Sequence, residues 1–131
     1  MLKISREVDL GLLLMVELTR LRRGEAVGLK TWAEERSLPY RFLSKIAVKL
    51  KKAGLLKSKE GREGGYRLAR SGKKINVGEV IRALEGSVAA VPCLQGIECK
   101  AEGFCRQKVL MSKLSKVMSK QLEKVSLEDL C

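Results

Sequence analysis

The sequence predicts a mainly α-helical protein with a small β wing: a winged helix-turn-helix followed by a long C-terminal dimerisation helix. Three observations support this prediction. The first is the order of helix, tight turn, basic helix and glycine-tipped hairpin. The second is a formal net charge of +12, most of which lies on the residues of those elements. The third is a late amphipathic helix that has no obvious core within the chain to cover.

The first two helices are predicted from apolar periodicity and from end signals. Ser5 has the side chain of an N-cap, and the helix that it opens is expected to run to about Arg23, before a glycine. A short second helix is expected over residues 30–36, where Thr31 and Glu34 have the spacing of a capping box.

A third helix is expected from a first turn at Pro39 to Ala53, because proline is tolerated where no backbone N–H is needed and Gly54 follows as a stop. Its apolar residues fall on one face: Phe42, Leu43, Ile46 and Leu50. Basic residues fall on the opposite face: Arg41, Lys45, Lys49 and Lys52. This pattern indicates a DNA recognition helix.

A β-hairpin is expected next, with strands at residues 55–59 and 66–70 around a glycine-rich tip. A fourth helix is predicted at residues 77–85, because Asn76 and Glu79 match a capping box and a glycine follows.

The C-terminal part is predicted to be an irregular segment at residues 87–104 and a last helix at about residues 106–125. The apolar residues of this helix are Val109, Leu110, Leu114, Val117, Met118, Leu122 and Val125. With no obvious core within the chain to cover, the helix is expected to pack on a second copy of itself. The chain therefore divides into a winged-helix DNA-binding domain at 1–87, a cysteine loop at 88–105, and a dimerisation helix with its tail at 106–131.

The distribution of positive charge indicates double-stranded DNA as a partner. Residues 30–74 hold 14 basic and four acidic residues, so this window carries +10 of the +12. Charge concentrated on one motif favours a polyanion over an ordinary solvated face. Contacts to base edges or nearby phosphates are expected from Tyr40, Arg41, Ser44 and Lys45. Phosphate contacts are expected from Lys49, Lys52, Lys57 and Lys59, and a minor-groove contact from Arg62 at the wing tip.

Other classes of protein are disfavoured by what the sequence lacks. No stretch reaches the roughly 18 consecutive apolar residues of a membrane span, and the chain opens directly into an amphipathic pattern, so a cytoplasmic protein is expected. With no histidine, no acid pair at catalytic spacing and no phosphate-binding glycine motif, an enzyme is not expected. An iron-sulfur redox protein would share the cysteines but does not need the basic window.

Three of the four cysteines, Cys93, Cys99 and Cys105, stand at six-residue steps. Thiolates favour iron-sulfur clusters, zinc or cuprous copper. A six-residue step on a helix rotates by about 600°, so a shared site requires a loop. Structural zinc sites usually pair cysteines two to four residues apart, and no such pair exists here. An iron-sulfur cluster is favoured, zinc and redox-reactive thiols stay open, and Cys131 is expected to be a free thiol.

Residues 30–50, 61–68 and 77–81 and the three cysteines together resemble the iron-sulfur winged-helix regulators typified by IscR and NsrR. The resemblance covers nearly the whole chain. It implies a homodimer crossed through the C-terminal helix and a two-iron or four-iron cluster bound by the loop cysteines. It also implies transcriptional control, usually repression, that responds to nitric oxide, redox or iron-sulfur status. A cluster-free regulator that senses redox state through the same thiols is the alternative.

The chain departs from this family pattern at two positions. In the IscR-like branch a histidine after the third cysteine completes the site, and the matching residue here is Lys108, a poor ligand when protonated. NsrR-like members instead use a carboxylate near the start of the partner chain's first helix, which Asp9 matches, so the resemblance implies Asp9 as a ligand in trans. An acid there also stabilises a helix without metal, and Glu7 or an exogenous ligand is the fallback. Glu60 replaces a common basic residue and leaves the wing contact to Arg62.

Overall fold

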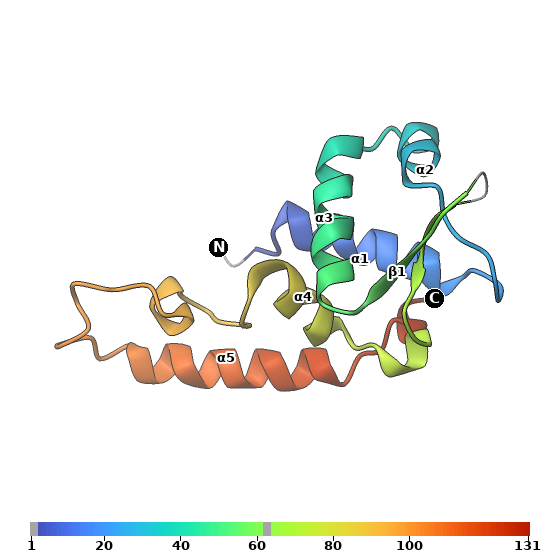
Figure 1. The fold of residues 1–131 in the computed structure, drawn as a ribbon. Helices are drawn as coiled ribbons and strands as arrows, with labels where there is room; N and C mark the ends of the chain where they lie inside the picture. Colours follow the sequence, from blue (N-terminus) through green and yellow to red (C-terminus); the bar gives the residue numbers. More distant parts are fainter. Residues whose placement is uncertain (1–2, 62–63) are drawn as a thin grey trace.

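The computed structural model describes residues 3–61 and 64–131. The helices are α1 (Arg6–Thr19), α2 (Leu29–Glu35), α3 (Tyr40–Lys52), α4 (Val77–Glu85) and α5 (Lys108–Glu123). Two strands, β1 (Leu56–Lys59) and β2 (Gly65–Leu68), form an antiparallel sheet. Figure 1 shows the first four helices and the sheet gathered together, while α5 runs along one side to an extended loop. The mainly α-helical class with a small β wing is confirmed.

Helix α1 begins as predicted and ends earlier than predicted. The Ser5 hydroxyl accepts a hydrogen bond from a backbone N–H three residues on, at 3.2 Å. The helix ends at Thr19, so the prediction of an end near Arg23 was wrong. The chain leaves the helix because Val27 pairs with Tyr66 of β2 through two backbone hydrogen bonds of 2.9 Å each.

The starts of α2 and α3 also differ from the predictions. Gly28 is the N-cap of α2 and provides no side-chain hydrogen bond, so the predicted capping box of Thr31 and Glu34 was wrong. Pro39 is the N-cap of α3 and lies just before the first turn. The predicted apolar face is buried at Leu43, Ile46 and Leu50, whereas Phe42 is half-buried.

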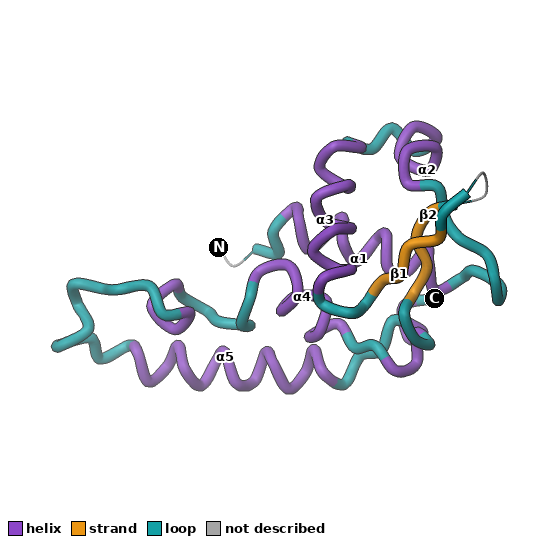
Figure 2. Tube along the Cα trace, in the orientation of Figure 1, coloured by secondary structure: helices purple, strands orange, loops and turns teal. Residues whose placement is uncertain are grey.

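The wing sheet has one face toward the core and one face away from it. Leu56 lies opposite Leu68 in the ladder, and Lys57 lies opposite Arg67. Because side chains alternate along a strand, the leucine pair faces the core and the basic pair faces outward (Figure 2 shows the strands in orange). Gly65 is required in the sheet, because its φ is +152° and an added Cβ would overlap the carbonyl of Val27.

Helix α4 has the predicted capping box: the Asn76 and Glu79 side chains each accept a hydrogen bond from the other residue's backbone N–H, at 3.0 and 2.9 Å. The tail that follows α5 returns to this region. Leu127 is fully buried, and its N–H donates to the carbonyl of Ile75 at 2.9 Å. The tail therefore packs onto the winged-helix core.

Helix α5 has no fully buried residue. Its later residues Leu122 and Val125, the latter just beyond the helix, pack against the core, so the expectation that it covers no core within the chain was wrong at that end. The earlier part has four exposed apolar residues: Val109, Leu110, Leu114 and Val117. None of the helices in the described ranges is long and apolar enough to cross a membrane.

Candidate DNA-binding surface and cysteine cavity

The first turns of α3 bring the four predicted base-contacting residues to one side of the helix. Tyr40, Arg41 and Lys45 are exposed, and Ser44 is half-buried. Residues three or four apart on a helix are neighbours on its surface, and Tyr40 with Ser44, and Arg41 with Lys45, have this spacing, so these side chains form one polar surface. Their contact with DNA stays a prediction.

The residues predicted to contact phosphates have different surroundings. Lys52 and Lys57 are exposed. Lys49 is exposed as well, but its ammonium group lies 2.5 Å from a Glu7 carboxylate oxygen on α1 and 3.5 Å from the Leu84 carbonyl oxygen. Lys59 donates to the carbonyl of Gly24 at 3.0 Å. The remaining predicted contact, Arg62, lies outside the described residues.

Sequence reasoning did not single out the buried tryptophan of α2, a helix that packs against α3. Trp32 is 4% exposed, and the guanidinium of Arg36 lies 5.3 Å from the centroid of its ring. Arg36 also pairs with Glu17 of α1 at 3.3 Å. The four-residue spacing of Trp32 and Arg36 was the available signal, because it places both residues on one face of a helix. The pair of Arg36 with Glu17 joins the end of α2 to α1.

The three evenly spaced cysteines line one cavity of about 510 Å³. Cys93 lies in a short 3-10 helix (Pro92–Gln95), Cys99 in the loop, and Cys105 just before α5, and all three are half-buried free thiols. The predicted irregular segment is confirmed apart from this short helix. Within residues 3–61 and 64–131, no group of three or more histidine, cysteine or acidic residues is already close enough to hold a metal ion.

Lys108 lines the same cavity but is held by an acidic partner. Its ammonium group donates to the Glu102 carboxylate at 2.8 Å. The hydrogen bond and the negative charge of Glu102 raise the pKa of Lys108, and the same hydrogen bond lowers the pKa of Glu102. A protonated amine has no lone pair to donate, so Lys108 does not fit the role of a metal ligand.

Asp9 is exposed on α1 and does not line the cysteine cavity. Its side chain has no hydrogen bond or salt bridge with another residue in the described part of the chain. Leu13, one turn further on, is 48% exposed, and Ile4 is 65% exposed. Around this end of α1 there is therefore an exposed apolar surface and a carboxylate with no partner among the described residues.

A family model described as "Rrf2: Iron-dependent Transcriptional regulator" matches residues 4–131. Among curated proteins, the regulator CymR of Bacillus subtilis is 32% identical over 130 residues, covering 98% of this chain and 89% of CymR. The regulator NsrR of Bacillus licheniformis is 29% identical over 131 residues, covering 98% of this chain and 92% of NsrR.

Solved structures show the same similarity across nearly the whole chain. CymR of B. subtilis, described as the global cysteine regulator, superposes with a TM-score of 0.79 at 31% identity, covering 99% of this chain and 96% of that one. IscR of T. potens superposes with a TM-score of 0.77 at 32% identity, covering 98% and 85%. The predicted winged-helix fold is confirmed by these neighbours.

Proposed function

The chain belongs to the Rrf2 family of transcriptional regulators, and we propose that an iron-sulfur cluster controls its binding to a DNA operator. The family consists of transcriptional regulators and not enzymes, as expected from the sequence. The relatives include both NsrR and IscR and the cysteine regulator CymR at similar identity, so the mode of sensing is inferred from this chain's own residues.

The single observation that carries the proposal is that Cys93, Cys99 and Cys105 line one cavity. Three thiols are a donor set that suits an iron-sulfur cluster. The cavity is lined mostly by apolar atoms, which restricts the access of water to a bound group. We propose that these cysteines hold a two-iron or four-iron cluster.

Asp9 of the partner subunit is the fourth ligand in this proposal. Two features of α1 support it: the Asp9 carboxylate is exposed and has no partner within residues 3–61 and 64–131, and exposed apolar side chains lie near it, as expected where a second copy packs. The early part of α5 has a matching exposed apolar surface at Val109, Leu110 and Val117. We therefore propose a homodimer in which α5 covers the partner's α1 and brings the cysteine loop to Asp9.

A bound cluster would supply coordinate bonds that join the cysteine loop of one protomer to α1 of the other. The chain itself connects that end of α1 to the recognition helix, since Glu7 is two residues before Asp9 and pairs with Lys49 of α3 at 2.5 Å. A shift of α1 would therefore move α3. To change the DNA-competent population from 1% to 99%, cluster state must bias the two conformations by about 5.5 kcal/mol.

The proposed signal is nitric oxide, an oxidant or iron-sulfur status. Asp9 is a harder and more labile ligand than a thiolate, so its bond is the expected point of attack. The proposed output is repression through contacts of Tyr40, Arg41, Ser44 and Lys45 with an operator.

The test is anaerobic purification followed by a visible spectrum and by iron and sulfide counts. We expect iron and sulfide in equal amounts in the wild-type protein, and their loss in Cys93→Ser. Cys131→Ser is the matched control, because Cys131 is an exposed thiol outside the cavity, and it should retain the cluster. Mobility shifts of the protein with and without cluster on the same duplex should differ. A wild-type protein that binds zinc or no metal under anaerobic conditions would contradict the proposal.

The second candidate is a cluster-free thiol sensor. It is favoured by the similarity to CymR and by the three free thiols in one cavity. For this candidate, metal-free protein should bind the duplex, and mild oxidation should change that binding in the wild type but not in Cys93→Ser.

A further inference from the structure

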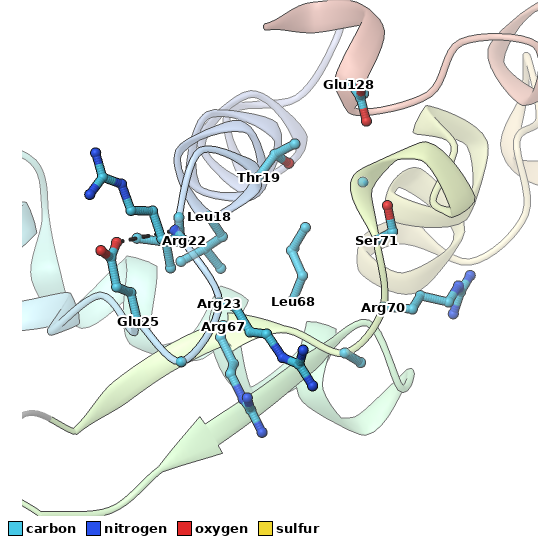
Figure 3. Close-up of a pocket in the computed structure, with 14 residues that line it drawn as sticks. Leu18, Thr19, Arg22, Arg23, Glu25, Arg67, Leu68, Arg70, Ser71 and Glu128 are labelled. Atoms are coloured by element: carbon cyan, nitrogen blue, oxygen red, sulfur yellow. Dashed lines mark hydrogen bonds between the residues drawn. The ribbon is translucent and has the colours of Figure 1, made fainter.

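A cavity of about 640 Å³ lies where the end of α1, the turn between α1 and α2, and the end of β2 meet (Figure 3). Four arginines and two glutamates contribute its charges: Arg22, Arg23, Arg67, Arg70, Glu25 and Glu128. Arginine guanidinium groups suit phosphate because their planar donors match its oxygens. An arginine that is already paired with an acidic side chain is less available to bind phosphate.

Arg70 is already paired, since it forms a salt bridge with Glu79 and donates to the Lys74 carbonyl. The two glutamates of the cavity are also occupied. A carboxylate oxygen of Glu25 accepts from the backbone N–H of Arg22 at 3.1 Å, and Glu128 pairs with Lys73 at 3.7 Å.

Three guanidinium groups remain, those of Arg22, Arg23 and Arg67. None of them forms a salt bridge with a carboxylate within residues 3–61 and 64–131. The cavity therefore presents positive charge that the described chain does not neutralise. Such a cluster attracts an anion from outside the chain.

This cluster is continuous with the outer face of the wing. Arg67 lies directly opposite Lys57 in the sheet, and Lys59 is two residues further along the same face. The hydrogen bond from Lys59 to Gly24 joins the turn to the wing. In Figure 3, Arg23 and Arg67 point to one side of the sheet while Leu68 points to the other, toward α1.

The basic surface lies far from the proposed dimer contacts. Figure 1 shows the wing and the α1–α2 turn on the opposite side of the molecule from the cysteine loop and the start of α5. For protomers joined through α5, we expect this surface to face away from the partner. DNA that reaches it would then lie beyond the part of the duplex that α3 is proposed to contact.

We propose that Arg23 and Arg67, together with Lys57, bind the phosphates of duplex DNA that flanks the operator core. An extended row suits a nucleic-acid strand better than a small anion: two residues of a β-strand advance about 7 Å, over which a DNA strand presents about two phosphates. This inference rests on the proposed function, because it presumes an operator read by α3.

The test uses a duplex that the wild-type protein selects from a random pool. It is prepared as the selected core and as the core extended by about ten base pairs on each side, one helical turn. Removing Arg67 from both protomers removes two phosphate contacts. With a slope of about 0.9 per phosphate, Arg67→Ala should weaken binding to the extended duplex about 30-fold at 0.15 M salt, and make the salt slope shallower by about 1.8. Binding to the core should be unchanged.

Two control variants separate the outcomes. Arg20→Ala removes an exposed charge near the cavity but not in its lining, and should leave both duplexes unaffected. Lys45→Ala should weaken binding to both. Equal loss on the two duplexes in Arg67→Ala, or no loss on either, would overturn the inference while leaving the proposed function intact. A second result would also overturn the inference: pyrophosphate raises the Tm of the wild type but not that of Arg67→Ala, and duplex length has no effect on DNA affinity. If the wild type selects no duplex, the proposed function fails, and this inference fails with it.

Discussion

Residues 8–84 contain all the buried hydrophobic side chains of the described chain except Leu127, whereas residues 85–126 contain none. The first region packs four helices and a wing around one core. The second region has an irregular loop, a helix with no fully buried residue, and apolar side chains that are exposed. Burial of apolar surface is the main favourable term in folding, so the two regions differ in what holds them in place.

Because the two regions are packed differently, binding of a group or a partner should change them to different extents. A buried core resists small changes because its side chains are closely packed. A loop with few buried contacts is less stable locally, and binding of a group or a partner changes it at lower cost. The region with the proposed DNA contacts is therefore the closely packed part of this molecule, and the cysteine loop with the start of α5 is the part that a bound group or a second copy is expected to stabilise.

The strongest test of this comparison is Leu127→Ala, because Leu127 belongs to the core despite its place near the C-terminus. The side chain is fully buried, so its removal should lower the free energy of unfolding by about 2–5 kcal/mol. Leu130 is 46% exposed, and Leu130→Ala should change it by no more than about 0.5 kcal/mol. Urea unfolding of both variants measures this. Equal effects would mean that the tail does not belong to the core.

Glycine substitutions distinguish the two regions in a second way. Gly65→Ala places a methyl group against the Val27 carbonyl at a positive φ, and should cost about 1–3 kcal/mol. Gly103→Ala in the cysteine loop meets no atom within 4 Å and should have little effect. Thermal unfolding compares them. An equally large loss in Gly103→Ala would contradict the view that the loop is weakly packed.

Charge placed on α5 should affect association and not folding. Val117 is 57% exposed, so Val117→Lys should leave monomer stability within about 0.5 kcal/mol. If the helix packs on a second copy, the same change should raise the dimer dissociation constant at least tenfold, or about 1.4 kcal/mol. Sedimentation velocity over a dilution series tests this, with Lys120→Gln as the control. An unchanged dimer would place the interface elsewhere.

The smallest effect is expected at the pair between α1 and α3. Lys49→Ala removes a partly exposed ion pair with Glu7 and should cost about 0.2–1 kcal/mol. Glu7→Gln should cost a similar amount, and the double variant less than the sum of the two. Lys45→Ala should leave stability unchanged, since Lys45 is exposed and has no described acidic partner. Additive losses would show that Glu7 and Lys49 do not interact.

Short-range patterns predicted some helix starts and not others. The capping box of Asn76 and Glu79 is a pattern of neighbouring residues, and both of its bonds are present, whereas the similar pattern of Thr31 and Glu34 forms no capping box because α2 begins after Gly28. The end of α1 was missed because a distant contact sets it, the pairing of Val27 with Tyr66. The residues near Arg23 in the sequence give no information about that pairing.

The contacts of the candidate site residues could not be predicted from the sequence either, because the residues that they contact are distant in the sequence. Helical spacing correctly placed Lys49 on an exposed face, but it did not predict the ion pair with Glu7, which is 42 residues away in sequence. The cysteines were recognised by type and spacing, and the structure adds that they line one cavity with Lys108. Ligation by Asp9 stays a prediction, since a single chain does not bring it to the cavity.

The most direct measurement of the central proposal is a mixed dimer isolated with two affinity tags. One protomer has Asp9→Ala with intact cysteines, and the other has intact Asp9 with Cys93, Cys99 and Cys105 all changed to serine. Ligation in trans gives this dimer one complete site, so it should retain about one cluster per dimer by iron, sulfide and anaerobic visible spectrum, with the lifetime of the wild-type cluster. A cluster as labile as that of the Asp9→Ala homodimer would contradict ligation by Asp9 of the partner subunit.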